Sequence, residues 1–137
     1  MEQQIQELAV LAKEVAQNSY SPYSNFPVGA AFEDEAGNVF TGCNVENLSF
    51  PEGLCAERTA IVKAVSEKGP SMRVKTLVVY TPTQKATTPC GGCRQVISEF
   101  AADDARIICT CDTDDVLDIS FKDLFPYSLV IDGLAKK

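Results

Sequence analysis

Three cysteines and one glutamate fall within two short segments of this chain, residues 55–57 and 90–93. Cys90 and Cys93 have the C-x-x-C spacing that lets two sulfurs reach one metal ion, and Cys55 offers a third sulfur. The sequence contains no histidine, which excludes imidazole-based nucleophilic catalysis and mixed Cys/His zinc sites. The candidate metal ligands are therefore the cysteine sulfurs, and the candidate group for proton transfer is the nearby carboxylate of Glu57.

The number of sulfur ligands distinguishes two kinds of zinc site. Structural zinc is normally closed by four protein ligands, whereas catalytic zinc keeps one position for water. Three cysteines favour the open kind, with one zinc ion per chain. We interpret Cys43, Cys109 and Cys111 as small hydrophobic residues, but a fourth ligand from among them would make a non-catalytic zinc module. At the level of sequence that alternative stays open.

The charge of such a centre calls for neighbouring cations. Zinc held by three thiolates is a singly negative centre, which disfavours a bound hydroxide unless positive groups compensate. We expect Arg58 and Arg94, which closely follow Cys55 and Cys93, to donate hydrogen bonds to the sulfurs. Both segments are also predicted to begin helices, whose N-terminal dipoles favour thiolates. Glu57 is expected to accept the proton of the water.

The hydrophobic pattern predicts the elements that position these residues. In chain order they are a helix over 2–18, a hairpin of 26–32 and 39–43, a helix over 55–68, a strand over 76–81, a helix over 90–100, a strand over 106–111 and a short helix over 121–125. Residues 127–131 are predicted as either a terminal strand or an extended arm. The alternation of strands and helices predicts an α/β fold with a partly parallel sheet flanked by helices.

The composition limits the classes of partner. The chain has 12 basic and 19 acidic residues, a net charge of −7, and no stretch that concentrates Lys and Arg. Polynucleotide binding needs a cationic groove, so no polynucleotide partner is expected. The sequence shows neither a signal peptide nor the ~20 apolar residues of a membrane span, and we predict one cytoplasmic domain over residues 1–137 with no membrane partner.

Four longer motifs connect these residues to a known family. Residues 26–31, 42–47, 55–60 and 89–95 resemble, in order and spacing, the small homotetrameric zinc-dependent cytidine deaminases. The resemblance implies a three-layer α/β/α fold with a mixed central sheet of about five strands. It also implies hydrolytic deamination of cytidine or deoxycytidine to uridine or deoxyuridine and ammonia, carried out by a homotetramer.

The resemblance also implies roles for individual residues. Zinc-bound hydroxide would attack C4 of the cytosine ring, with Glu57 as the proton shuttle. Asn44 and Glu46 would hydrogen-bond the ribose 3′-hydroxyl, while Phe26 and Ala56 would contact the substrate. A polar pair built to receive a hydroxyl discriminates strongly against ligands that lack it. The expected substrate is therefore a pyrimidine nucleoside.

Two positions depart from the pattern of the family. Phe50 stands where many relatives have a Tyr near a neighbouring subunit's site. Leu129 stands where relatives have a Phe that stacks on the base from another subunit, with Phe125 or Tyr127 as possible substitutes. These departures bear on substrate range and affinity. Another free pyrimidine, or a blasticidin-type compound, is therefore the alternative substrate for the same chemistry.

Overall fold

The computed structural model describes residues 1–134, and its strands form one mixed five-stranded sheet in the order β2-β1-β3-β4-β5. Of the neighbouring strands, β3 and β4 are parallel and the other pairs are antiparallel. The elements are α1 (Gln3–Val15), η1 (Ala16–Asn18), β1 (Gly29–Asp34), β2 (Val39–Cys43), η2 (Phe50–Glu52), α2 (Ala56–Lys68), β3 (Val74–Tyr80), α3 (Gly91–Phe100), β4 (Ala101–Thr110), β5 (Leu117–Ser120) and α4 (Phe121–Leu124). The predicted single domain runs to residue 137, so its last three residues lie outside the described part.

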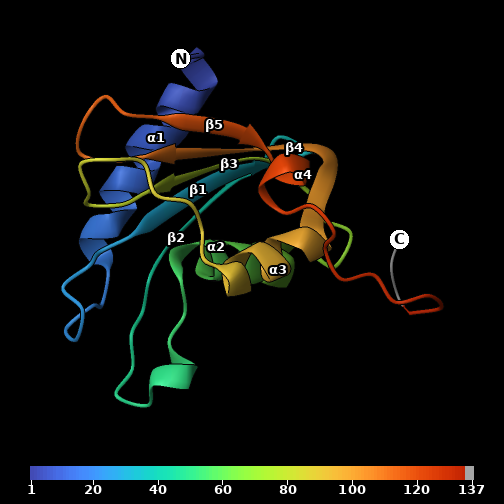
Figure 1. Ribbon diagram of the computed structural model, residues 1–137, viewed down its shortest axis with the longest axis horizontal. Helices are drawn as coiled ribbons and strands as arrows, with labels where there is room; N and C mark the ends of the chain where they lie inside the picture. Colours follow the sequence, from blue (N-terminus) through green and yellow to red (C-terminus); the bar gives the residue numbers. More distant parts are fainter. Residues whose placement is uncertain (135–137) are drawn as a thin grey trace.

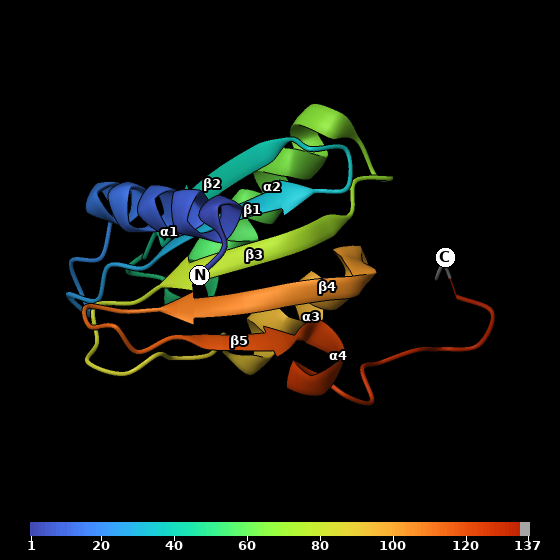
Figure 2. The ribbon, with the colours of Figure 1, turned by 90° about the horizontal axis from the view of Figure 1, so that it is seen from above.

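Helices cover both faces of this sheet (Figures 1 and 2). Successive residues of a strand point to opposite faces, so Val78 of β3 packs with Leu8 of α1, whereas Leu77 packs with Ile61 of α2 and Ile97 of α3. This arrangement confirms the expected α/β/α layers, and it covers β3 on both faces. Within residues 1–134, no helix has the length and apolar content needed to cross a membrane.

Two glycines let helices lie directly on the sheet. A Cβ atom at Gly42 of β2 would lie 2.5 Å from the backbone nitrogen of Ala60 in α2. At Gly29 of β1 it would lie 1.8 Å from the carbonyl oxygen of Ala12 in α1. Any larger residue would push the helix away from the strand. Gly42 therefore sets the depth of α2, whose first turn carries Glu57.

The parallel crossover β3–α3–β4 places the second cysteine segment. Strands β3 and β4 pair in parallel, and α3 lies between them in the chain. In such a unit the carboxyl end of the first strand leads towards the start of the helix, which is where open α/β sheets bind ligands. The predicted helix over 90–100 is confirmed as α3, and the predicted strand over 106–111 begins earlier, at Ala101.

The C-terminal part differs from the sequence-based expectation. The fifth strand is β5, which pairs antiparallel with β4 and which the hydrophobic pattern did not predict. It is an edge strand with three of its four residues exposed, so it lacks the apolar run that marks the inner strands. Residues 127–131 form no strand and leave the body as an extended arm (Figure 2). The predicted short helix after β5 is confirmed as α4.

A loop over residues 44–54, which contains η2, projects beside the start of α2 (Figure 1). Isolated bridges pair Val45 with both Tyr20 and Leu54 at the base of the loop. Further out, the side chains of Leu48 and Phe50 are 77% and 73% exposed. The loop is thus held at its base and presents apolar side chains to its surroundings.

Candidate active site

The three predicted zinc ligands come together at the N-termini of two helices. Cys55 is the N-cap of α2, Cys90 is the N-cap of α3, and Cys93 lies in the first turn of α3. Their Sγ atoms all lie within 4.8 Å of one another, and those of Cys90 and Cys93 are 3.4 Å apart. Zn–S bonds of about 2.3 Å in a tetrahedron place sulfurs about 3.8 Å apart. The cluster therefore fits one zinc ion.

No fourth protein ligand joins this cluster within residues 1–134. Cys109 and Cys111 are buried and Cys43 is partly buried, all three as free thiols away from the other sulfurs. Cys109 belongs to the core shared by the sheet, α2 and α3, in agreement with its interpretation as a small hydrophobic residue. Three sulfurs leave one tetrahedral position for a non-protein ligand, as in catalytic zinc sites. A closed structural zinc module does not fit this arrangement.

The thiols of the cluster differ in acidity. Hydrogen bonding from Cys93 lowers the pKa of Cys55 to about 6, and Cys90 and the charge of Arg58 act in the same direction against partial burial. The pKa of Cys93 is raised, first by its hydrogen bond to Cys55 and then by burial. Zinc binds thiolates, and the lowered pKa of Cys55 favours its thiolate form.

The carboxyl group of Glu57 is buried in the first turn of α2, where the residue is 4% exposed. Burial raises the pKa of Glu57 to about 7, with a smaller contribution from the charge on Cys55 and an opposing backbone hydrogen bond. A carboxyl group with a pKa near neutrality both takes and returns a proton at physiological pH. This is the property expected of a general acid-base.

One cavity of about 380 Å³ contains the predicted metal ligands, Glu57 and the predicted substrate contacts. Its volume is in the range of small-molecule sites, roughly 300–1,000 Å³. The structure therefore brings together eight of the ten residues predicted from the sequence, and Arg58 and Arg94 do not line the cavity. The eight are Phe26, Asn44, Glu46, Cys55, Ala56, Glu57, Cys90 and Cys93.

Glu46 is held by the loop that precedes β1. Its Oε1 accepts hydrogen bonds from the backbone nitrogens of Tyr23, at 3.0 Å, and Ser24, at 3.2 Å. Its Oε2 accepts a hydrogen bond from the hydroxyl of Ser24. The Ser24 hydroxyl is also the main cause of a lowered pKa of Glu46. The carboxylate is thus ionised and fixed in direction where it borders the cavity.

The side-chain amide of Asn44 is also fixed by hydrogen bonds to neighbouring residues. Its Oδ1 accepts hydrogen bonds from the backbone nitrogen of Val28, at 2.9 Å, and from the hydroxyl of Ser19. Its Nδ2 donates to the carbonyl oxygen of Phe26 at 2.8 Å. Asn44 therefore fixes the path of the chain around Phe26 as well as bordering the cavity.

The two arginines differ from each other in their partners. Arg58 is partly buried in the first turn of α2, and its charge contributes to the lowered pKa of Cys55. The expected hydrogen bond from Arg58 to a sulfur stays a prediction. Arg94 does not reach the sulfurs. Its guanidinium donates instead to the carbonyl oxygens of Pro89 and Leu124 and to the hydroxyl of Thr88. The expected sulfur contacts of Arg94 are therefore replaced by contacts with the chain around the ligand.

Sequence reasoning missed several residues of the cavity wall. Thr87 and Thr88 directly precede the Pro89-Cys90 pair, and Thr81 follows β3. Thr87 and Thr88 lie within three residues of the predicted ligand Cys90, and this nearness in sequence could have identified them as cavity residues. The remaining missed residues come from the loop and strand that face α2, and they are Ser24, Val28 and Val79.

An α/β/α fold that gathers three cysteines and a buried glutamate at two helix N-termini defines the class of zinc-dependent deaminases, which are hydrolases. A comparison with family models narrows the class. Residues 2–111 match the model described as the cytidine and deoxycytidylate deaminase zinc-binding region. The chain belongs to this family.

Individual relatives agree with this assignment. A cytidine deaminase of Sporosarcina psychrophila is 46% identical over 96 residues, 70% of this chain and 69% of the relative. A cytidine deaminase of Halalkalibacterium halodurans is 38% identical over 120 residues, 85% of this chain and 89% of the relative. The crystal structure of cytidine deaminase from Burkholderia pseudomallei superposes with a TM-score of 0.85 at 38% identity, over 94% of this chain and 100% of that one.

Proposed function

We propose that this protein hydrolyses cytidine, deoxycytidine or both to the corresponding uridine and ammonia. The observation that carries the proposal is a cluster of three thiols in one cavity with a buried glutamate, to which residues 1–134 add no fourth protein ligand. The proposed zinc ligands are Cys55, Cys90 and Cys93. Hydrolytic deamination of a pyrimidine ring requires a metal with an open coordination position, which activates water, and a neighbouring general acid-base, which transfers protons.

In the proposed mechanism the protein supplies the proton transfers and the alignment of the ring. When bound, zinc supplies a water of lowered pKa in the open position. Glu57 accepts the proton that the attacking water loses and donates it to N3 of the pyrimidine. It then accepts the proton of the new hydroxyl on C4 and delivers it to the leaving amine, so that the C4–N bond breaks, ammonia leaves and the C4 carbonyl forms. The raised pKa of Glu57 suits both directions of transfer. Phe26, Val28 and Val79 provide apolar walls for the ring.

The hydrogen bonds of Asn44 and Glu46 leave the two groups that a sugar hydroxyl needs. A carboxylate has about four acceptor positions, and three of those on Glu46 receive donors from Tyr23 and Ser24. The amide of Asn44 has two N–H donors, one of which is used by Phe26. One acceptor and one donor remain. A ribose hydroxyl donates to the first and accepts from the second, which supports a nucleoside over a free base.

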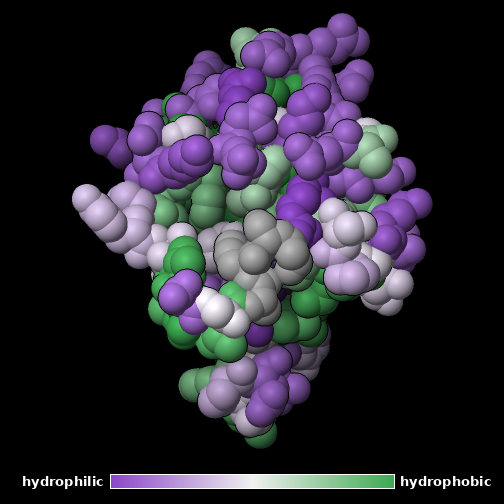
Figure 3. All heavy atoms as spheres, turned by 90° about the vertical axis from the view of Figure 1, so that its right-hand side faces the viewer, coloured by the Kyte–Doolittle hydropathy of each residue, from purple (hydrophilic) through white to green (hydrophobic). Residues whose placement is uncertain are grey.

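We further propose that the protein acts as a single-domain homotetramer in the cytoplasm. Exposed apolar side chains on the arm after α4 support an assembly, and they are Leu129, Val130, Ile131 and Leu134. Figure 3 shows hydrophobic residues gathered across the middle of the face from which the arm emerges. The free state of all six cysteines fits a reducing compartment. Size-exclusion chromatography with light scattering tests the assembly, and a monomeric mass contradicts it.

The proposed activity is tested by a substrate panel. Purified protein is incubated with cytidine, deoxycytidine, cytosine, cytidine monophosphate and blasticidin, and the ultraviolet change and released ammonia are followed. We expect conversion of at least one of the two nucleosides and much slower reaction of cytosine, which lacks the hydroxyl that Asn44 and Glu46 receive. If only cytosine or blasticidin is converted, the enzyme carries out the same chemistry on another substrate. If no compound of the panel is converted, the proposal is contradicted.

A further inference from the structure

Arg94 connects three parts of the molecule that are separate in the chain. Its Nε donates to the carbonyl oxygen of Pro89 at 2.8 Å, and its Nη2 donates to the hydroxyl of Thr88 at 2.9 Å. Its Nη1 donates to the carbonyl oxygen of Leu124, at the end of α4, at 3.0 Å. One guanidinium therefore joins the loop that precedes Cys90, the first turn of α3, and α4.

Cys90 is the ligand with the least support from the core. It is exposed, whereas Cys93 is buried and Cys55 is partly buried. Residues 81–90 form neither helix nor strand, so the chain reaches Cys90 through a loop. The carbonyl oxygen of Cys90 accepts a hydrogen bond from the backbone nitrogen of Arg94 at 3.0 Å. Arg94 thus bonds to three successive residues that end at the ligand.

The chemistry of the side chain explains why arginine occupies this position. A guanidinium presents five N–H donors in a rigid plane and holds several acceptors at once, whereas a lysine ammonium is a compact charge on a flexible stem. A cation in the first turn of a helix is disfavoured by the helix dipole. At Arg94 the three acceptors that the guanidinium reaches, on Pro89, Leu124 and Thr88, offset that cost.

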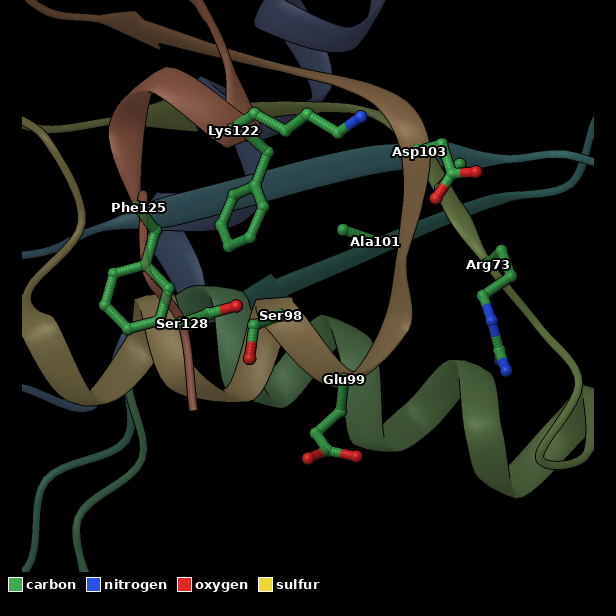
Figure 4. Close-up of a pocket in the computed structure, with 10 residues that line it drawn as sticks. Arg73, Ser98, Glu99, Ala101, Asp103, Lys122, Phe125 and Ser128 are labelled. Carbon is green, nitrogen blue, oxygen red and sulfur yellow. The ribbon is translucent and has the colours of Figure 1, made fainter. Parts of the chain in front are cut away.

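The far contact of Arg94 is made with a well-packed helix. Phe121 and Leu124 of α4 are buried, and the rings of Phe121 and Phe125 lie 6.0 Å apart. Figure 4 shows Phe125 close to α3, beside a separate cavity of about 210 Å³ that contains none of the predicted site residues. The packing of α4 therefore fixes the position of the carbonyl oxygen of Leu124, which accepts the hydrogen bond from Arg94.

We propose that Arg94 is a positioning residue of the metal centre, which holds residues 88–90 against α3 and α4 so that the thiol of Cys90 stays within bonding distance of zinc. The inference rests on the ligand set proposed above. It makes α4, 30 residues further along the chain, part of the support of the metal. Contacts that orient metal ligands change metal affinity or activity roughly 10- to 100-fold when they are removed.

The test measures zinc release in the absence of any nucleoside. Parent protein, Arg94→Gln, Arg94→Lys and Thr88→Val are loaded with zinc and mixed with an excess of a chelating dye. We expect roughly 10- to 100-fold faster release from Arg94→Gln, and smaller increases from the other two variants, which keep some of the contacts. Arg73→Gln is the matched control and is expected to release zinc at the parent rate. Arg73 also donates to two backbone carbonyls, those of Pro70 and Met72, but far along the chain from the ligands.

Cobalt substitution separates positioning of the ligand from a general loss of stability. The visible bands of thiolate-bound cobalt depend on the ligand geometry, so we expect them to shift in the Arg94 variants and to stay unchanged in Arg73→Gln. If Arg94→Gln fails to fold, Arg94→Lys and Thr88→Val decide the matter. Parent rates of zinc release together with parent cobalt bands in both conservative variants overturn the proposal. Neither readout depends on whether cytidine is the substrate.

Discussion

Two parts of the cavity are built in different ways. The metal part, which is proposed to bind zinc, consists of Cys55, Glu57, Cys90 and Cys93. The sugar part, which is proposed to bind the ribose, consists of Ser24, Asn44 and Glu46. The metal part rests on helices packed against the core, with Glu57 and Cys93 only 4% and 1% exposed. The sugar part is made by two loops that are far apart in sequence. There Ser24 and Glu46 hold each other by hydrogen bonds and are both accessible to solvent.

This difference separates the reaction from the choice of substrate. Groups on buried helices keep the short distances that zinc ligation and proton transfer require. Loops on a rigid scaffold vary more easily, and they are where binding residues are commonly found. Substitutions in the metal part are therefore expected to change zinc content and kcat, whereas substitutions in the sugar part change KM.

Cys93→Ala should remove both zinc and activity. Cys93 is the most buried of the three proposed ligands, and its removal leaves only two sulfurs for a metal that catalytic sites hold by three protein ligands. Zinc per chain is measured by metal analysis after gel filtration, together with the rate of uridine formation. Cys43→Ala is the control, since Cys43 lies outside the cluster, and it should keep one zinc and the parent rate. Full zinc content in Cys93→Ala would falsify the ligand assignment.

Glu57→Gln should keep zinc and lose roughly 10²- to 10⁴-fold in kcat, which is the usual contribution of a general acid-base. Glutamine fills the same buried space but cannot accept or return the proton. Steady-state kinetics on zinc-loaded protein measure the loss. Glu67→Gln, an exposed change near the end of the same helix, should leave kcat as it is. An active Glu57→Gln enzyme would contradict the proton shuttle.

Glu46→Gln should raise KM for cytidine roughly 10- to 100-fold with a small change in kcat, since hydrogen bonds to charged groups contribute about 1.5–3 kcal/mol. Zinc content should stay at the parent value, in contrast with the cysteine variants. The control is Glu52→Gln in η2, which is exposed and does not line the cavity. A fall in kcat without a rise in KM would show that the sugar part is not separate from the chemistry.

Ser24→Ala should have the smallest effect, an increase of about fivefold in KM, because the hydrogen bond from the hydroxyl to Glu46 contributes about 1 kcal/mol. The variant also removes the hydrogen bond that this hydroxyl accepts from the backbone nitrogen of Phe26. Glu46 keeps its two bonds from backbone nitrogens in this variant. Initial rates across cytidine concentrations measure the change. If KM is unchanged in Ser24→Ala while Glu46→Gln raises it, the serine does not orient the carboxylate.

The sequence was most informative where residue spacing and helix geometry act together. Cys55 and Glu57 are two residues apart at the start of one helix, and Cys90 and Cys93 are three apart at the start of another. Helix geometry therefore predicts each pair, and the resemblance to the family brings the two pairs together. The inner strand β3 was predictable for a similar reason, because burial on both faces requires a continuous apolar run.

The features that were missed depend on contacts between distant residues. Strand β5 is specified by its pairing with β4, including an ion pair of Asp118 with Arg106, and little in its own composition marks a strand. The partners of Arg94 include a carbonyl oxygen at Leu124, which only the folded chain brings near. No sequence motif marks a hydrogen bond between residues 30 apart in the chain, so Arg94 was expected to reach the sulfurs instead.

The most direct test of a single catalytic zinc ion is a metal titration of the activity. Zinc is removed with a chelator, the protein is dialysed, and zinc is returned in small steps while the rate of cytidine deamination is followed. The account predicts no activity without metal, a linear rise, and saturation at one zinc per chain. Activity in the zinc-free protein, or saturation at another stoichiometry, would contradict it.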